Sequence, residues 1–94
     1  NVVMTKEFLK EYKSKKEEIK EIRQEKRYED RILILTKECE AVERFIEEIP
    51  ESLLRRIFRM YYIDNLTQKE IGDTLNMERS SISKKINRYL KSFL

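Results

Sequence analysis

Apolar residues recur through the middle of the chain in alternating steps of four and three. This spacing marks one side of an α-helix, and in particular the seam along which two helices pack in a coiled coil. The seam consists of Tyr28, Ile32, Leu35, Cys39, Val42, Ile46 and Ile49. From about Thr5 to Ile49 no residue breaks a helix, and Pro50 closes the segment. The pattern predicts a long, coiled-coil-like helical segment over residues 1–49.

Two chain paths fit this segment. Upstream of the seam the same spacing links Phe8, Tyr12, Ile19 and Ile22, but Lys15 and Lys26 fall on its line and "RQEKRYED" (residues 23–30) interrupts the phase. A continuous helix of ~44 residues would be ~65 Å long, whereas a reversal near Arg27 would give an antiparallel hairpin. We favour the long helix, with a kink, because residues 23–30 contain no Gly, Pro or Asn to make a turn.

After Pro50 the pattern predicts three shorter helices. The first carries an apolar face of Leu53, Leu54, Ile57, Phe58, Tyr61 and Tyr62, and Asn65, which tolerates the left-handed conformation, ends it. The second opens at Thr67, which forms a capping box with Glu70, and runs to about Leu75. The third begins near Arg79, and its buried stripe is Ile82, Ile86, Tyr89, Leu90 and Phe93. A short helix, a tight turn and a basic helix are typical of a helix-turn-helix domain, here over residues 50–94.

The glycine of this segment stands in a helix and the turn has none. Gly72 costs helix stability, about 1 kcal/mol relative to Ala, so we expect it where the two helices cross and their backbones come close. Asn76 is then the residue that makes the turn, because Asn is the next choice after Gly for a left-handed position.

Composition and charge agree with an all-α chain. Of 94 residues 41% are charged, with one Gly and one Pro. Residues 1–50 hold 12 basic and 13 acidic side chains, whereas residues 51–94 hold nine and five, so the positive excess is C-terminal. With no His and one Cys, we expect no catalytic set, no metal site and no cofactor. With neither a leader nor a long apolar run, we expect no membrane span and a cytoplasmic protein.

The C-terminal half carries a family resemblance. "YYIDNLTQKEIGDTL" followed by "RSSI", within residues 49–94, resembles the last domain, region four, of bacterial sigma factors. The chain is also similar to small phage-encoded transcriptional regulators of the ArpU and RinA type, which share that domain. The resemblance implies sequence-specific binding of promoter DNA to control transcription. Two positions depart from the family pattern: Glu78 replaces the Ser that caps the recognition helix, and Asn76 replaces the turn glycine.

The third helix supplies the candidate DNA contacts. With Ile82 and Ile86 facing inward, we expect the side chains near its N-terminus to read base edges: Ser80, Ser81 and Lys84. For phosphate contacts we expect Arg79, Lys85, Arg88 and Lys91, together with Thr67, Gln68 and Lys69 at the start of the preceding helix.

The expected partners are double-stranded DNA and a second copy of the chain. A homodimer through the seam would present two recognition helices to repeated half-sites, ~34 Å or a multiple apart. RNA polymerase is a further candidate partner. Two alternatives remain open: a polymerase-docking factor without direct DNA contact, and a ring-forming, small-terminase-like subunit of a DNA-packaging motor.

Overall fold

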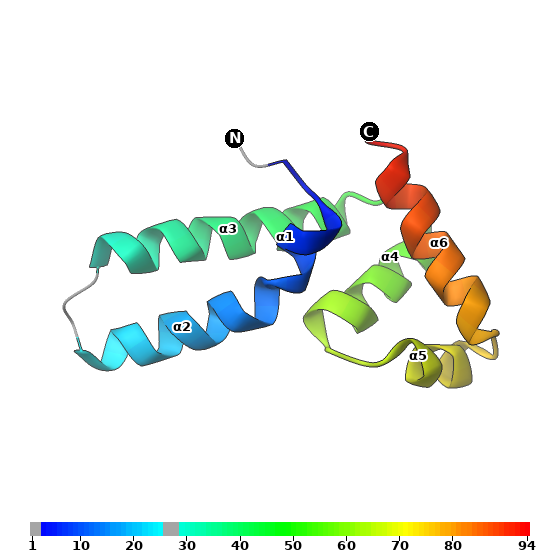
Figure 1. The fold of residues 1–94 in the computed structure, drawn as a ribbon, viewed down its shortest axis with the longest axis horizontal. Coiled ribbons are helices and arrows are strands. Elements are labelled where there is room, and N and C mark those ends of the chain that lie inside the picture. The colour runs from blue at the N-terminus through cyan, green and yellow to red at the C-terminus, as the bar shows by residue number, and fades with distance from the viewer. Residues whose placement is uncertain (1–2, 26–28) are drawn as a thin grey trace. The chain divides into compact units, whose positions relative to one another are not determined.

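The computed structural model describes residues 3–25 and 29–94, and every regular element in these ranges is helical (Figure 1). The predicted all-α class is confirmed. The chain divides into two compact units, Asn1–Phe45 and Ile46–Leu94, so the division falls a few residues before the predicted limit of 49. Within the described ranges, no helix has the length and apolar character needed to cross a membrane.

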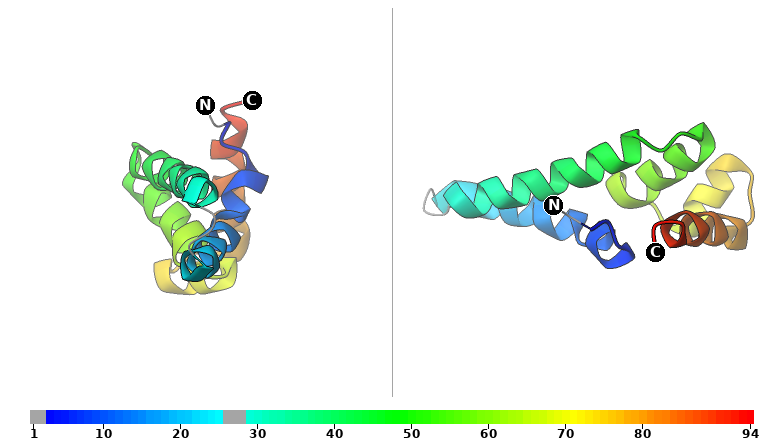
Figure 2. Two further views of the ribbon diagram at one scale, coloured as in Figure 1. Left: turned by 90° about the vertical axis from the view of Figure 1, so that its left-hand side faces the viewer. Right: turned by 90° about the horizontal axis from the view of Figure 1, so that it is seen from above.

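The first unit is built from α1 (Lys6–Lys10), α2 (Tyr12–Glu25) and most of α3 (Glu29–Glu47). The Tyr12 hydroxyl donates to Glu43, and Arg31 Nε donates to Glu18 Oε1 at 3.1 Å. The start of α2 thus lies beside the end of α3, and the two helices run antiparallel, as Figures 1 and 2 show. The continuous helix that we favoured is wrong and the hairpin alternative is confirmed. The predicted reversal point, Arg27, lies outside the described residues.

The predicted seam is covered within a single chain. Leu35, Cys39, Val42 and Ile46 are at most 3% exposed and Ile49 is fully buried. Ile32 is half-buried, and Tyr28 lies outside the described residues. Within the first unit, folding back buries Leu35, Cys39 and Val42 without a second chain, which is the physical reason for the hairpin. A dimer through the same side chains would therefore require the hairpin to open.

Lys15, which interrupts the apolar pattern, is accommodated by charge and by an aromatic ring. Its side chain is 11% exposed, and its ammonium lies 3.3 Å from Glu38 Oε1 and 3.5 Å from the centre of the Phe8 ring. A buried ammonium needs such partners because leaving water costs several kcal/mol, in rough terms. The lysine therefore stays within the packed face of the hairpin.

The second unit holds α4 (Ser52–Phe58), the π-helical turn η1 (Arg59–Ile63), α5 (Gln68–Leu75) and α6 (Arg79–Lys91). The structure confirms three shorter helices after Pro50, but the first of them widens at its end. In η1 the Asp64 amide donates to the Arg59 carbonyl at 2.9 Å, five residues back. Asn65 follows with φ of 61°, as predicted, and redirects the chain toward α5.

The core of this unit joins all of its helices. Its buried apolar side chains are Ile46, Ile49, Leu54, Ile57, Phe58, Tyr62, Ile71, Ile82 and Ile86. The rings of Phe58 and Tyr89 meet edge to face at 5.5 Å, which ties α4 to α6. Of the predicted stripe of α6, Ile82 and Ile86 are buried and Tyr89 and Leu90 are half-buried. Phe93 is wrong: it is 56% exposed, because α6 ends at Lys91 and the chain leaves the helical phase.

Candidate nucleic-acid interface

A reciprocal capping box opens α5. The Glu70 amide donates to Thr67 Oγ1 at 3.1 Å, and the Thr67 amide donates to Glu70 Oε1 at 2.9 Å. The predicted box is therefore present. The amide of Thr67 holds the pKa of the Glu70 carboxyl below its usual value, because it hydrogen-bonds the charged form. The box fixes where the helix begins and which residues form its first turn.

The turn between α5 and α6 folds back onto Gly72. Asn76 has φ of 56° in the left-handed region, as predicted, and its amide donates to the Gly72 carbonyl. The Met77 amide donates to the same oxygen at 2.8 Å. A Cβ on Gly72 would stand 2.5 Å from the Met77 carbonyl oxygen. Gly72 is thus needed for a close approach, as expected, although the nearest group belongs to the turn and not to the body of α6.

The recognition helix α6 begins without a side-chain cap. Glu78 occupies the N-cap position with an extended backbone, and its side chain makes no capping hydrogen bond. Its carbonyl accepts from the amides of Ser81 and Ile82 at 3.0 and 3.2 Å. The first amides of α6 are therefore left for solvent or for an anion.

One face of α6 is buried and the other is basic. Ile82 and Ile86 are at most 1% exposed, which confirms them as the inward face. Exposed positions are Arg79, Ser80, Lys84, Arg88 and Lys91, while Ser81 and Lys85 are half-buried. The helix carries five basic residues and no acidic one. Among the described residues no ion pair occupies these five side chains. The structure thus leaves five of the seven predicted α6 residues open to solvent and places Ser81 and Lys85 at the edge of the buried face.

Of the predicted residues at the start of α5, Lys69 lines the same hollow as Arg79 of α6. Thr67 and Lys69 are exposed and Gln68 is half-buried. The Lys69 ammonium is 3.1 Å from Asp73 Oδ2, and both side chains are at least 70% exposed. Such a pair is worth at most about 1 kcal/mol, so Lys69 can exchange the carboxylate for a phosphate at small cost.

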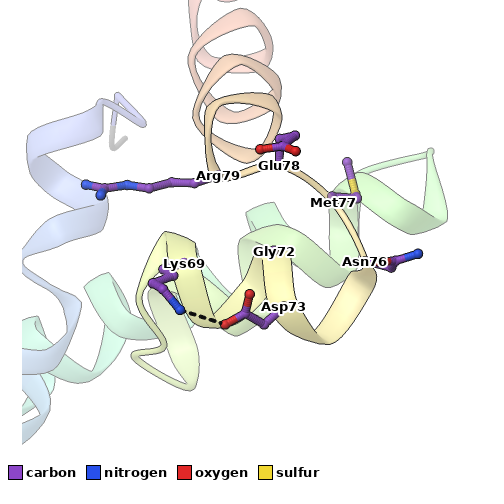
Figure 3. A pocket seen from close by; sticks show the side chains of 7 residues that line it. All are labelled: Lys69, Gly72, Asp73, Asn76, Met77, Glu78 and Arg79. Carbon is purple, nitrogen blue, oxygen red and sulfur yellow. Dashed lines mark hydrogen bonds and ion pairs between the residues drawn. The ribbon is translucent and has the colours of Figure 1, made fainter.

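An open hollow of ≈ 620 Å³ lies between α5 and the start of α6. It is lined by Lys69, Gly72, Asp73, Asn76, Met77, Glu78 and Arg79. Figure 3 shows the Lys69–Asp73 pair on α5 and, across the hollow, Glu78 and Arg79 at the start of α6. Sequence reasoning did not single out Asp73, although its position four residues after Lys69 is the spacing of a helical ion pair.

The arginines of the first helix in this unit serve structure. Arg55 Nη1 donates to the Ile49 carbonyl at 2.7 Å, and Arg59 pairs with Glu47. Both contacts join the end of α3 to the segment that follows Pro50. The positive charge that remains unpaired among the described residues of this unit therefore lies mainly on α6.

The geometry defines a helix-turn-helix domain, the class in which a second helix enters the major groove. Residues 52–92 match the family described as sigma-70, region 4. The predicted resemblance to region four is therefore confirmed over these residues, which form a helix-turn-helix domain similar to sigma-70 region 4. Comparisons with curated proteins and with solved structures find no match.

Proposed function

We propose that this chain is a sequence-specific DNA-binding regulator of transcription that reads the major groove with α6. The observation that carries the proposal is that α6 exposes four basic side chains and half-buries a fifth, Lys85, and contains no acidic residue. A helix of this kind, buried on one side by Ile82 and Ile86, can enter a groove ≈ 12 Å wide without losing its core contacts.

The side chains of α6 fall into two groups, those placed to contact base edges and those placed to contact phosphates. Ser80, Ser81 and Lys84 stand in the first two turns, and residues at the start of a recognition helix contact base edges. Arg79, Lys85, Arg88 and Lys91 suit phosphates, as do Thr67, Gln68 and Lys69 on α5. The first amides of α6, which Glu78 does not cap, can add contacts to a phosphate oxygen.

We further propose that the regulator is of the phage-encoded ArpU and RinA type and acts beside RNA polymerase. Support comes from "YYIDNLTQKEIGDTL" and "RSSI", and from a helical segment ahead of the matched domain. This proposal implies that the chain binds promoter DNA.

Fluorescence anisotropy with duplexes selected from a random pool tests the proposal. The test variant is Lys84→Glu/Arg88→Glu. A matched control, Lys13→Glu/Lys20→Glu, makes the same change in net charge at exposed positions of α2. We expect the test variant to lose the selected duplex and the control to retain most of the binding.

The salt dependence of the binding constant distinguishes phosphate contacts from contacts to base edges. Each phosphate contact contributes roughly 0.9 to the slope of log K against log salt, so Arg88→Gln should lower the slope by about one. Ser81→Ala should instead change the preferred sequence at one position. Binding that is equally weak for the wild type and the Lys84→Glu/Arg88→Glu variant would refute the proposal and favour a protein-docking surface.

A further inference from the structure

The carboxylates of α5 and of the turn that follows it differ in what engages them. On α5, Glu70 Oε1 accepts from the Thr67 amide at 2.9 Å. Asp73 Oδ2 lies 3.1 Å from the Lys69 ammonium. Glu78, the exposed N-cap residue of α6, makes no side-chain capping hydrogen bond. Within the part of the chain that the structure describes, no ion pair includes it. Its carboxylate is therefore open to a group from outside the chain.

The backbone on both sides of Glu78 is held by hydrogen bonds. On the turn side, the Met77 amide donates to the Gly72 carbonyl at 2.8 Å. On the helix side, the Glu78 carbonyl accepts from the amides of Ser81 and Ile82 at 3.0 and 3.2 Å. The side chain thus projects from a fixed point at the rim of the hollow (Figure 3). A contact made from a fixed point loses less conformational entropy on binding.

A free carboxylate at this end of α6 opposes DNA binding unless it meets a hydrogen-bond donor. DNA carries one negative charge per ≈ 1.7 Å of helix axis, and Glu78 directly precedes Arg79, the first residue of α6. The start of a recognition helix is also the part that reaches base edges. A carboxylate there either repels the duplex or accepts a hydrogen bond from a base.

The edges of the bases in the major groove differ in what they offer a carboxylate. Guanine presents two acceptors, and thymine presents an acceptor and a methyl group. Adenine presents an amino group beside the acceptor N7, which would repel the second carboxylate oxygen. Cytosine presents the N4 amino group alone. Cytosine is therefore the base that fits the charge of Glu78.

We propose that Glu78 is a specificity-determining residue, whose carboxylate accepts a hydrogen bond from the N4 amino group of one cytosine in the binding site. This inference rests on the proposed function, because it requires α6 in the major groove. Lys84, one of the expected base readers, carries the opposite charge and suits the acceptors of guanine. Glu78 rejects those acceptors, so the two side chains discriminate between bases in opposite senses.

Parallel selection of duplexes from a random pool, with the full wild-type chain and with Glu78→Gln, tests the proposal. Glutamine keeps the length of the side chain and removes its charge, and its amide pairs with N6 and N7 of adenine. We expect the wild type to select cytosine at one position and Glu78→Gln to select adenine there, with the other positions unchanged. The circular dichroism spectrum should not change, because the exposed side chain makes no capping bond.

Fluorescence anisotropy with duplexes that differ only at that base pair measures the preference. The wild type should bind the cytosine duplex at least about fivefold more tightly than the others, since a mismatched base pair typically costs a factor of at least this order. Asp73→Asn is the matched control. It removes one negative charge from the opposite side of the hollow and releases Lys69, and it should retain the preference for cytosine.

Two results would overturn this inference and leave the proposed function intact. In the first, the wild type and Glu78→Gln select the same base at every position. In the second, Glu78→Gln binds all the duplexes more tightly by the same factor, which would mean that Glu78 only repels phosphates. A wild-type chain that selects no sequence would refute the proposed function, and this inference with it.

Discussion

Gly72→Ala tests the reason for a glycine inside α5. The added methyl carbon would stand 2.5 Å from the Met77 carbonyl oxygen and 3.5 Å from the backbone nitrogen of Arg79. Real Cβ atoms do not approach other atoms to less than 3.0 Å, so the turn must move. That movement is resisted, because the amides of Asn76 and Met77 both donate to the Gly72 carbonyl.

Two opposing terms set the size of the effect. Alanine gains about 1 kcal/mol over glycine in a helix. Forcing a methyl group into filled space costs about 1–3 kcal/mol, and here the obstacle is backbone that cannot rotate away as a side chain would. We expect the clash to prevail, with a net loss of about 1–2 kcal/mol. In a chain of this length that lowers the melting temperature by roughly 5–15 °C.

Urea unfolding of the full chain, followed by circular dichroism, measures the loss. Amide hydrogen exchange assigns it to α5 and α6. Thr74→Ala is the matched control, because Thr74 is exposed on the same helix and only its hydroxyl bond to the Glu70 carbonyl is lost. The control should change stability by less than about 0.5 kcal/mol. If Gly72→Ala instead gained stability, as propensity alone dictates, the close-approach argument would be refuted.

Three further outcomes follow from the same contacts. Asn76→Gly should leave the free energy of unfolding nearly unchanged, whereas Asn76→Ala should lower it by about 1 kcal/mol, because alanine is strained at positive φ; urea titration of both variants checks this. Thr67→Ala should cost about 1 kcal/mol and, in a nuclear magnetic resonance titration, should raise the pKa of Glu70 only part of the way to its usual value, because the backbone amide of residue 67, the main cause of the lowering, remains; in the wild type the stabilising contribution of Glu70 is present above the usual pKa and is lost as pH falls. Burial and the hydrogen bond to Glu43 raise the pKa of Tyr12, so the stability that depends on its protonated hydroxyl is present below pH of about 10 and should be lost at higher pH; Tyr12→Phe should flatten that loss in alkaline unfolding curves.

Local chemistry made much of the helix-turn-helix domain predictable. Thr67 and Glu70 form a box that depends on four consecutive residues, and Asn65 and Asn76 take left-handed conformations that most residues avoid. Each feature is decided by bonds and sterics within one or two turns. The η1 turn after Phe58 was not predicted, because a π-helical turn differs from an α-helix by a single extra residue and leaves no periodic signature.

The exposed residues of α6 could be predicted from the sequence, whereas the residues that line the adjoining hollow could not. The spacing of Ile82 and Ile86 divides α6 into a buried and an open face, and all its basic side chains except the half-buried Lys85 are exposed. The hollow beside it depends on how α5 and α6 meet, so Asp73 became visible as a member only in three dimensions. The structural role of Arg55 could not be predicted either, because its hydrogen-bond partner, the Ile49 carbonyl, lies on the other side of Pro50.

The sequence by itself determined that the chain is helical, where α5 and α6 begin, and which side of each helix is apolar, because these depend on spacing, caps and backbone sterics over a few residues. Only the tertiary structure decided what covers the seam of Leu35, Cys39 and Val42. An apolar stripe requires burial but does not specify its partner, since a rod with a second copy and a hairpin satisfy the same pattern. The contacts of Tyr12 with Glu43 and of Lys15 with Glu38 join residues more than twenty positions apart, and such pairings are decided by packing between helices rather than by local periodicity.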